Sequence, residues 1–198
     1  MKRKLGSRNL LYPMPVTVVG AIVDGKPNFC NIAHVGILNA SPPHLISLGM
    51  SKSHLTNRGI RESGTVGISI LSADRIVDID YVGIVSGRNR DKSEVFEVAW
   101  GELGTAPLVA DAPLAMECRL KDIYDIGTHD VFIVEVVQAW ADEDVLVDGK
   151  PDLSLVRPVL FDMSGPWYWS LGERIGRPWS IGKGRPDPPH SGADEDAE

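Results

Sequence analysis

The apolar residues of this chain are grouped in short runs rich in Val, Ile and Thr, and turn-forming residues interrupt each run after a few positions. Residues 131–140 form the run with the strongest β composition. The 198 residues include 20 Gly and 14 Pro, which break such runs before regular helices can extend through them. A helix bundle is therefore disfavoured, and a mainly β protein is expected.

Six segments are predicted as strands from their β-branched residues and their alternating side chains. They are residues 16–23, 28–38, 44–50, 64–71, 114–121 and 131–140. A tight turn at Asp24 and Gly25 should join the first two into a hairpin. Short helices are expected at residues 53–62, capped by Ser53, at 72–80 and at 91–96. Short strands with so few helical residues between them favour a closed barrel over a doubly wound parallel sheet.

The charge of the chain is unevenly distributed. The formal net charge is −7, but five acidic residues and no Lys or Arg follow Arg185, so the preceding part is close to neutral. Such a chain has no electrostatic reason to bind nucleic acid, although it can build a local basic pocket for one small anion. We expect one domain over residues 1–180 and a disordered tail, Gly/Pro-rich and then acidic, over 181–198.

Membrane and secretion signals are not expected from this sequence. No apolar run reaches the roughly 18 residues of a membrane span, and the N-terminal residues lack the apolar core of a signal peptide. Cys30 and Cys118 could form a disulfide, but reduced thiols are the expectation. The prediction is a cytoplasmic protein.

One polar segment, residues 47–57, carries chemistry of its own. It ends a predicted strand, opens a predicted helix and offers hydroxyl, amine and imidazole groups together with free backbone amides. Such a turn can bind a phosphate monoester. A polar loop with a capping serine is the alternative. The side chains concerned are Ser47, Ser51, Lys52, Ser53, His54 and Thr56.

Other kinds of site are less well supported. Cys30, His34, Cys118 and His129 could bind a zinc ion. Cys118 and His129 are, however, too widely spaced for a usual structural site. Residues 176–184 have one residue too many between their glycines for a P-loop. The residues around Ser164 lack the first glycine of a nucleophile elbow. No metal is predicted.

The chain resembles the flavin reductase-like family, and within it the flavoredoxin-like branch. The matching segments occur in family order and together cover roughly residues 5–183. They are residues 12–20, 24–28, 41–43, 47–56, 80–87, 91–93, 117–120, 127–129 and 167–176.

The resemblance implies a split β-barrel with short helical insertions that binds FMN between the barrel and a second copy, as a homodimer. Residues 28–34 match the strand along the flavin ring, and His129 matches a family histidine near the flavin and the nicotinamide. Thr128 precedes this histidine where the family has Asp. The implied cofactor residues are Asn28, Asn31, Ile32, Ala33, His34, Ser47, Ser51, Lys52, Ser53, His54, Thr56, Lys92 and Trp167.

Two of these residues depart from the family pattern. Asn31 stands where relatives often have a small hydroxyl residue, and His34 stands where they often have an aromatic residue. Both substitutions keep hydrogen-bonding capacity but change the surroundings of the ring, and therefore its potential.

The resemblance implies an oxidoreductase that takes a hydride from NADH or NADPH at flavin N5 and passes electrons to an unknown acceptor. An FMN-containing electron carrier that a protein partner reduces is the main alternative. A non-catalytic barrel that serves protein interaction is a third reading.

Overall fold

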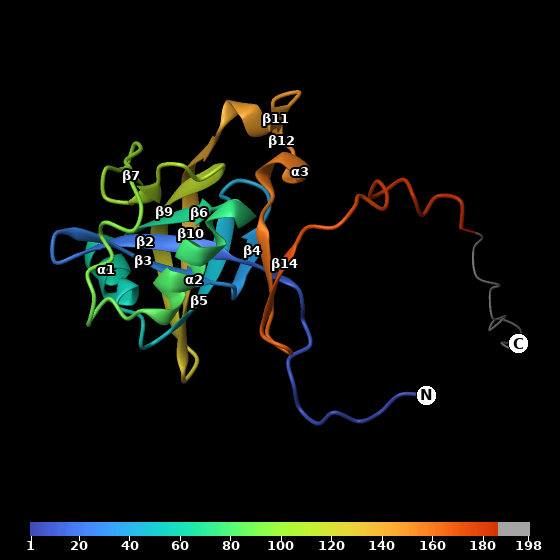
Figure 1. The fold of residues 1–198 in the computed structure, drawn as a ribbon, viewed down its shortest axis with the longest axis horizontal. Coiled ribbons are helices and arrows are strands. Elements are labelled where there is room, and N and C mark those ends of the chain that lie inside the picture. Colours follow the sequence, from blue (N-terminus) through green and yellow to red (C-terminus); the bar gives the residue numbers. More distant parts are fainter. Residues whose placement is uncertain (186–198) are drawn as a thin grey trace, which may run out of the picture.

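The structure is a computed structural model that describes residues 1–185. Its centre is a seven-stranded antiparallel sheet in the order β3-β2-β6-β9-β10-β5-β4 (Figure 1). The strands are β2 Thr17–Val23, β3 Lys26–Ile32, β4 Val35–Asn39, β5 Leu45–Ser51, β6 Thr65–Ile70, β9 Leu114–Asp125 and β10 His129–Ala141. The expected mainly β fold is confirmed.

The sheet closes on itself where β3 meets β4. These two edge strands are consecutive in the chain, and only Ala33 and His34 separate them. The segment predicted as one strand over residues 28–38 is therefore wrong in its continuity: the chain leaves one edge of the sheet and joins the other. The amide of Gly49 on β5 donates to the carbonyl of His34 at 2.7 Å and holds this crossing in place. The result is a barrel with a seam at residues 33–34.

Two apolar clusters stabilise the molecule. The first fills the barrel and includes Leu48, Phe132 and both cysteines, which are buried and form no disulfide. Burial raises the pKa of the Cys118 thiol to about 12, so this group stays protonated at neutral pH. The second cluster lies outside the barrel, where Phe29 and Val18 pack against α2, Ile76–Ile84.

A loop that contains β7, Val98–Ala99, and β8, Leu108–Val109, covers one side of the barrel. It is held by two buried acceptors: Ser69 Oγ accepts from the amide of Val109 at 3.0 Å, and the Glu117 carboxylate accepts from the amides of residues 102 and 103 at 2.8 and 3.2 Å. Strand β6 is consequently buried on both faces.

The helices follow the sequence in part. The predicted helix at 72–80 is confirmed: Ser72 caps a 3₁₀ turn, Ala73–Arg75, that leads into α2. The helix predicted at 53–62 is α1, Thr56–Ser63, but its predicted capping by Ser53 is wrong. The Ser53 hydroxyl pairs instead with the hydroxyl of Ser51 at 2.9 Å. The helix predicted at 91–96 is also wrong, because the carboxylate of Asp91 accepts from the amide of Ser93 and closes a turn.

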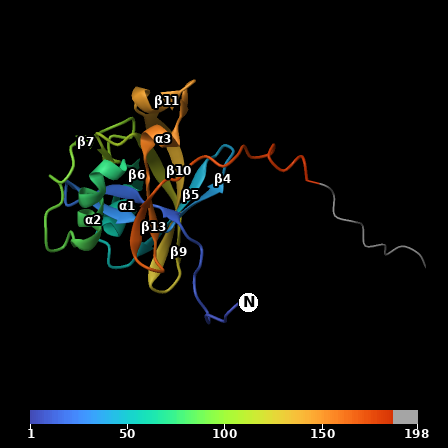
Figure 2. The same ribbon diagram turned by 45° about the vertical axis from the view of Figure 1, so that its right-hand side comes forward.

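The remaining elements lie along the C-terminal part of the chain. They are the 3₁₀ turn Glu143–Val145, β11 Leu146–Val147, β12 Lys150–Pro151, α3 Leu153–Val156, β13 Val159–Asp162 and β14 Trp167–Ser170. Strand β13 pairs with β14 and with β1, Met14–Pro15. This small sheet stands beside the barrel in Figure 1 and lies in front of it in Figure 2.

The chain beyond β14 leads away from the barrel, and residues 181–185 are exposed (Figure 2). The rest of the predicted tail, residues 186–198, lies outside the described residues, so the division near residue 180 stays a prediction. None of the helices described within residues 1–185 has the length and apolar character that a membrane crossing requires.

Candidate functional site

A hollow of about 200 Å³ opens at the seam of the barrel. Gly49 forms part of its wall, and a Cβ at this position would come within 3.0 Å of the Cβ of His34. The strand pairing therefore leaves a side-chain-free patch beside His34, of the kind that a flat ring can cover. The predicted residues that line the hollow are Asn31, Ile32, Ala33, His34, Ser51, His54 and His129.

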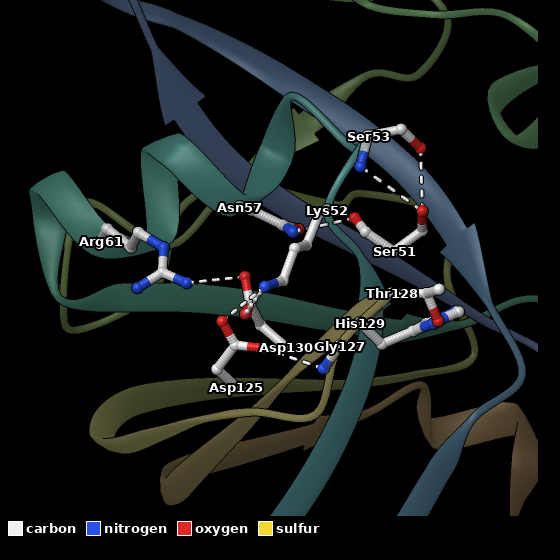
Figure 3. Close-up of polar contacts among 10 residues, drawn as sticks. All are labelled: Ser51, Lys52, Ser53, Asn57, Arg61, Asp125, Gly127, Thr128, His129 and Asp130. Atoms are coloured by element: carbon white, nitrogen blue, oxygen red, sulfur yellow. Dashed lines mark hydrogen bonds and ion pairs between the residues drawn. The ribbon is translucent and has the colours of Figure 1, made fainter.

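Three histidines from separate elements meet at this hollow. His34 comes from the seam, His54 from the turn before α1 and His129 from the first position of β10. The rings of His34 and His129 lie with their centroids 5.6 Å apart. The hydroxyl of Thr128 lies 2.9 Å from Nδ1 of His129 and fixes the orientation of this ring (Figure 3). The departure at position 128 thus keeps a hydrogen-bonding partner for the histidine.

A second hollow of about 220 Å³ shares His54 with the first and contains Lys92. The Lys92 side chain is only 4% exposed, and its ammonium group donates to the carbonyls of Val82 and Val85, both at 3.1 Å. No carboxylate within residues 1–185 pairs with it. Burial lowers the pKa of Lys92, as expected for a cation without a counter-ion.

The inward position of Lys92 is set by its neighbour. Asp91 accepts from the ammonium group of Lys26 at 2.7 Å and from the amide of Ser93 at 2.9 Å. These contacts hold the pKa of Asp91 well below its usual range. With Asp91 tied to β3, the side chain of Lys92 points into the protein.

Two buried polar atoms of residues 1–185 have no hydrogen-bond partner, and both belong to this region. They are Nδ1 of His54 and Oδ1 of Asn57. Because buried polar groups are nearly always paired, an unpaired imidazole nitrogen beside two hollows indicates a place where a ligand or water binds. The pKa of His54 is lowered, first by burial and then by the charges of Lys92 and His129.

The lowered pKa of His54 predicts how stability depends on pH. The unfolded chain binds this proton near the ordinary value of 6.5, whereas the folded protein binds it only at lower pH. We therefore expect the free energy of unfolding to fall as the pH drops below about 6.5. Denaturant titrations of the ligand-free protein across this range should show a smaller pH dependence for His54→Gln than for wild type. An equal pH dependence of the free energy of unfolding in the two proteins would contradict the lowered pKa of His54.

The predicted hydroxyl groups fall into three settings. Ser51 and Ser53 pair with each other on the exposed side of the turn after β5 (Figure 3). The hydroxyl of Thr56 is buried and accepts from the amide nitrogen of Asn28 at 2.7 Å. Ser47 lines a third hollow, of about 580 Å³, together with His34 and His129. The predicted cofactor residues other than Lys52 and Trp167 are thus part of one continuous region.

Lys52 points away from the three hollows. Its ammonium group lies 2.5 Å from the carboxylate of Asp125 and 3.8 Å from that of Asp130 (Figure 3). Its backbone amide donates to the carbonyl of Thr128 at 3.2 Å. Lys52 is therefore not among the residues that line the three hollows, and its contact with a cofactor stays a prediction.

Strand β14 presents a site residue that the sequence analysis missed. Tyr168 lines the first hollow, and its hydroxyl donates to Asp80 at 2.8 Å and lies 3.5 Å from Nδ2 of Asn31. Burial and Asp80 raise the pKa of Tyr168 to about 12. The predicted Trp167 is instead 66% exposed. Strand alternation could have found Tyr168, because it faces away from the side that Trp167 and Trp169 share.

Asn31 is used mainly to hold α2 in place. Its amide nitrogen donates to the carbonyl of Ile79 at 2.9 Å, and a Cβ on Gly83 would come within 2.3 Å of its amide oxygen. A small hydroxyl residue at this position could not reach so far. The substitution therefore alters how α2 packs beside the hollow.

The three hollows together suit an elongated ligand. One end has a buried cation that no carboxylate of residues 1–185 pairs with, and hydroxyl groups lie nearby. The other end has a flat glycine patch beside two histidines. A small molecule with an anionic group and a planar heteroaromatic ring matches both ends.

The comparisons with known proteins agree with this architecture. A flavoredoxin from Methanosarcina acetivorans superposes with a TM-score of 0.89 at 37% identity, covering 92% of this chain and 98% of that chain. The FMN reductase (NADH) RutF of Agrobacterium fabrum is 27% identical over 139 residues, which are 69% of this chain and 78% of that protein. A protein of Aeropyrum pernix is 27% identical over 165 residues, and these span 62% of that protein. Residues 8–162 match the flavin reductase like domain, so the chain belongs to the flavin reductase like domain family.

Proposed function

We propose that this protein is a cytoplasmic FMN-dependent oxidoreductase. It works as a homodimer, is reduced by NADH or NADPH, and passes the electrons to a second acceptor. The observation that carries the proposal is the buried ammonium group of Lys92, which faces a hollow and has no counter-ion within the described chain. A phosphate group would supply the missing charge.

The residues present fit FMN at both of its ends. Lys92, Ser53 and Thr56 line the hollow suited to the phosphate, and His54 has a free imidazole nitrogen where the two hollows join. Gly49 and the seam residues 31–34 offer the surface for the ring. The side-chain amide of Asn28 donates to the hydroxyl of Thr56 and holds it in place. Ser47 borders the larger hollow beside His129.

When bound, FMN supplies the ring nitrogen N5 that accepts a hydride. The protein then needs no acid or base for this transfer, and its contribution is orientation. His129 is the residue we assign to the nicotinamide, because it borders both the ring hollow and the 580 Å³ hollow beside it. Trp167, exposed in the single chain, is assigned to the surface that a second copy covers.

A second candidate is an electron carrier reduced by a protein partner. The observation in its favour is the 37% identity to a flavoredoxin over nearly the whole chain. In this case FMN binds in the same place, but neither nicotinamide nucleotide reduces it.

One experiment separates these candidates. The purified protein is loaded with FMN, made anaerobic and mixed in turn with NADH and NADPH while the flavin absorbance near 450 nm is recorded. We expect bleaching with at least one nucleotide. Bleaching by neither, with reversible bleaching by dithionite, would leave the electron carrier. A protein that stays colourless after incubation with FMN would overturn both and leave a protein-interaction role.

A further inference from the structure

A buried carboxylate follows His129 in the sequence. Asp130 is only 8% exposed, and its side chain lies on the face of β10 opposite to that of His129. Its carboxylate accepts from the guanidinium group of Arg61 on α1 at 2.7 Å, and the ammonium group of Lys52 lies 3.8 Å away (Figure 3). A buried carboxylate is costly without such partners, so Asp130 fixes β10 to α1 at this point.

Arg61 contacts two successive inward-facing residues of β10. Besides pairing with Asp130, its guanidinium carbon lies 5.1 Å from the ring centroid of Phe132. Phe132 is fully buried in the barrel core. The arginine therefore holds the first residues of β10 in a position that packing in the core also determines.

Helix α1 holds the neighbouring strand in the same way. The side-chain amide of Asn57 donates to the carbonyl of Ser51 at 2.9 Å, and Ser51 is the direct partner of His129 in the β5–β10 pairing. Lys52 completes the link, because its amide bonds the carbonyl of Thr128 and its ammonium group bridges Asp125 and Asp130. His129 thus lies on one of two paired strands, β10 and β5, that the same helix anchors (Figure 3).

We propose that Asp130, held by Arg61, is a positioning residue for His129. It has no contact with the hollow, and it acts by fixing the backbone from which the imidazole projects. In this chain the carboxylate next to the histidine is that of the following residue, Asp130. The preceding position, 128, holds Thr. The inference rests on the proposed function only for its kinetic consequence, since the positioning itself is a property of the free protein.

The variants Asp130→Asn and Arg61→Met test this proposal, with their double variant and with Lys121→Met as a control. Lys121 on β9 pairs with Glu135 on β10 at 3.0 Å, away from His129. In the ligand-free protein, the His129 ring signal in a carbon–proton NMR spectrum, assigned with His129→Gln, should shift in both pair variants and stay in place in the control. With FMN bound, flavin reduction at saturating nucleotide should slow about tenfold, while the FMN dissociation constant changes less than twofold.

The pattern across variants decides the outcome. Because both single variants remove the same Asp130–Arg61 contact, the double variant should lose less than the product of the two single losses. Rate losses of the single variants that multiply in the double variant would overturn the proposal. So would an unmoved His129 signal, or a loss of FMN affinity as large as the loss of rate. If neither nucleotide reduces the wild-type protein, the proposed function fails, and the NMR comparison still decides whether Asp130 positions His129.

Discussion

Replacing Lys92 by Met should weaken FMN binding by roughly 10- to 150-fold, which corresponds to about 1.5–3 kcal/mol for a charge-assisted contact. Methionine matches the apolar stem of lysine but lacks the ammonium group, so the apolar contacts of the buried stem survive. The binding of riboflavin, which has the same ring without the phosphate, should change little. Titration of both ligands, followed by flavin fluorescence, measures the difference.

The controls assign the effect to the phosphate. Lys121→Met removes an exposed, paired lysine and should leave both affinities unchanged. Equal losses for FMN and riboflavin would show that the variant damages the whole site, and unchanged FMN affinity would remove Lys92 from it.

The pH dependence of FMN binding follows from the same residue. Burial lowers the pKa of Lys92 in the free protein, and a bound phosphate would raise it. The charge contribution is therefore fully present below the lowered pKa and is lost as the pH rises through the higher pKa of the complex. A wild-type affinity that declines at alkaline pH, with a flatter profile for Lys92→Met, is the expected result.

Residues of the site differ in how far the sequence could identify them. The resemblance places Asn31 and His34 within segment 28–34, the strand along the flavin ring, and both line the hollow. Lys92 had only its place in the family pattern, because a lone lysine in a polar segment carries no local sign of burial. What makes it distinctive is the packing of α2 and the turn at Asp91, and both depend on contacts far apart in the sequence.

The break in strand 28–38 could not be read from local composition. Residues on both sides of Ala33 favour β structure, so the pattern indicates one continuous strand. The break exists because β3 and β4 belong to opposite edges of the sheet, and only closure of the barrel reveals this. The site lies at this break, which is why its shape was outside the reach of sequence reasoning.

Two glycines in neighbouring strands show the same limit. Gly20 and Gly67 are direct partners in the β2–β6 pairing. A Cβ on either would come within 2.4 or 2.1 Å, respectively, of the carbonyl oxygen of Pro107. In the sequence each looks like an ordinary small residue in an apolar strand, whereas in the structure the pair makes room for the backbone of a covering loop.

Gly67→Ala should therefore destabilise the protein by about 3 kcal/mol, because the new methyl group would meet the backbone of Pro107 and β6 is buried on both faces. Gly172→Ala is the control, since no atom of residues 1–185 outside its own chain neighbours lies within 4 Å of its Cβ position. Denaturant unfolding of both variants and wild type measures the free energies. A Gly67→Ala protein within about 0.5 kcal/mol of the control would mean that the loop can withdraw from the strand, and that close contact with Pro107 is not what keeps this position a glycine.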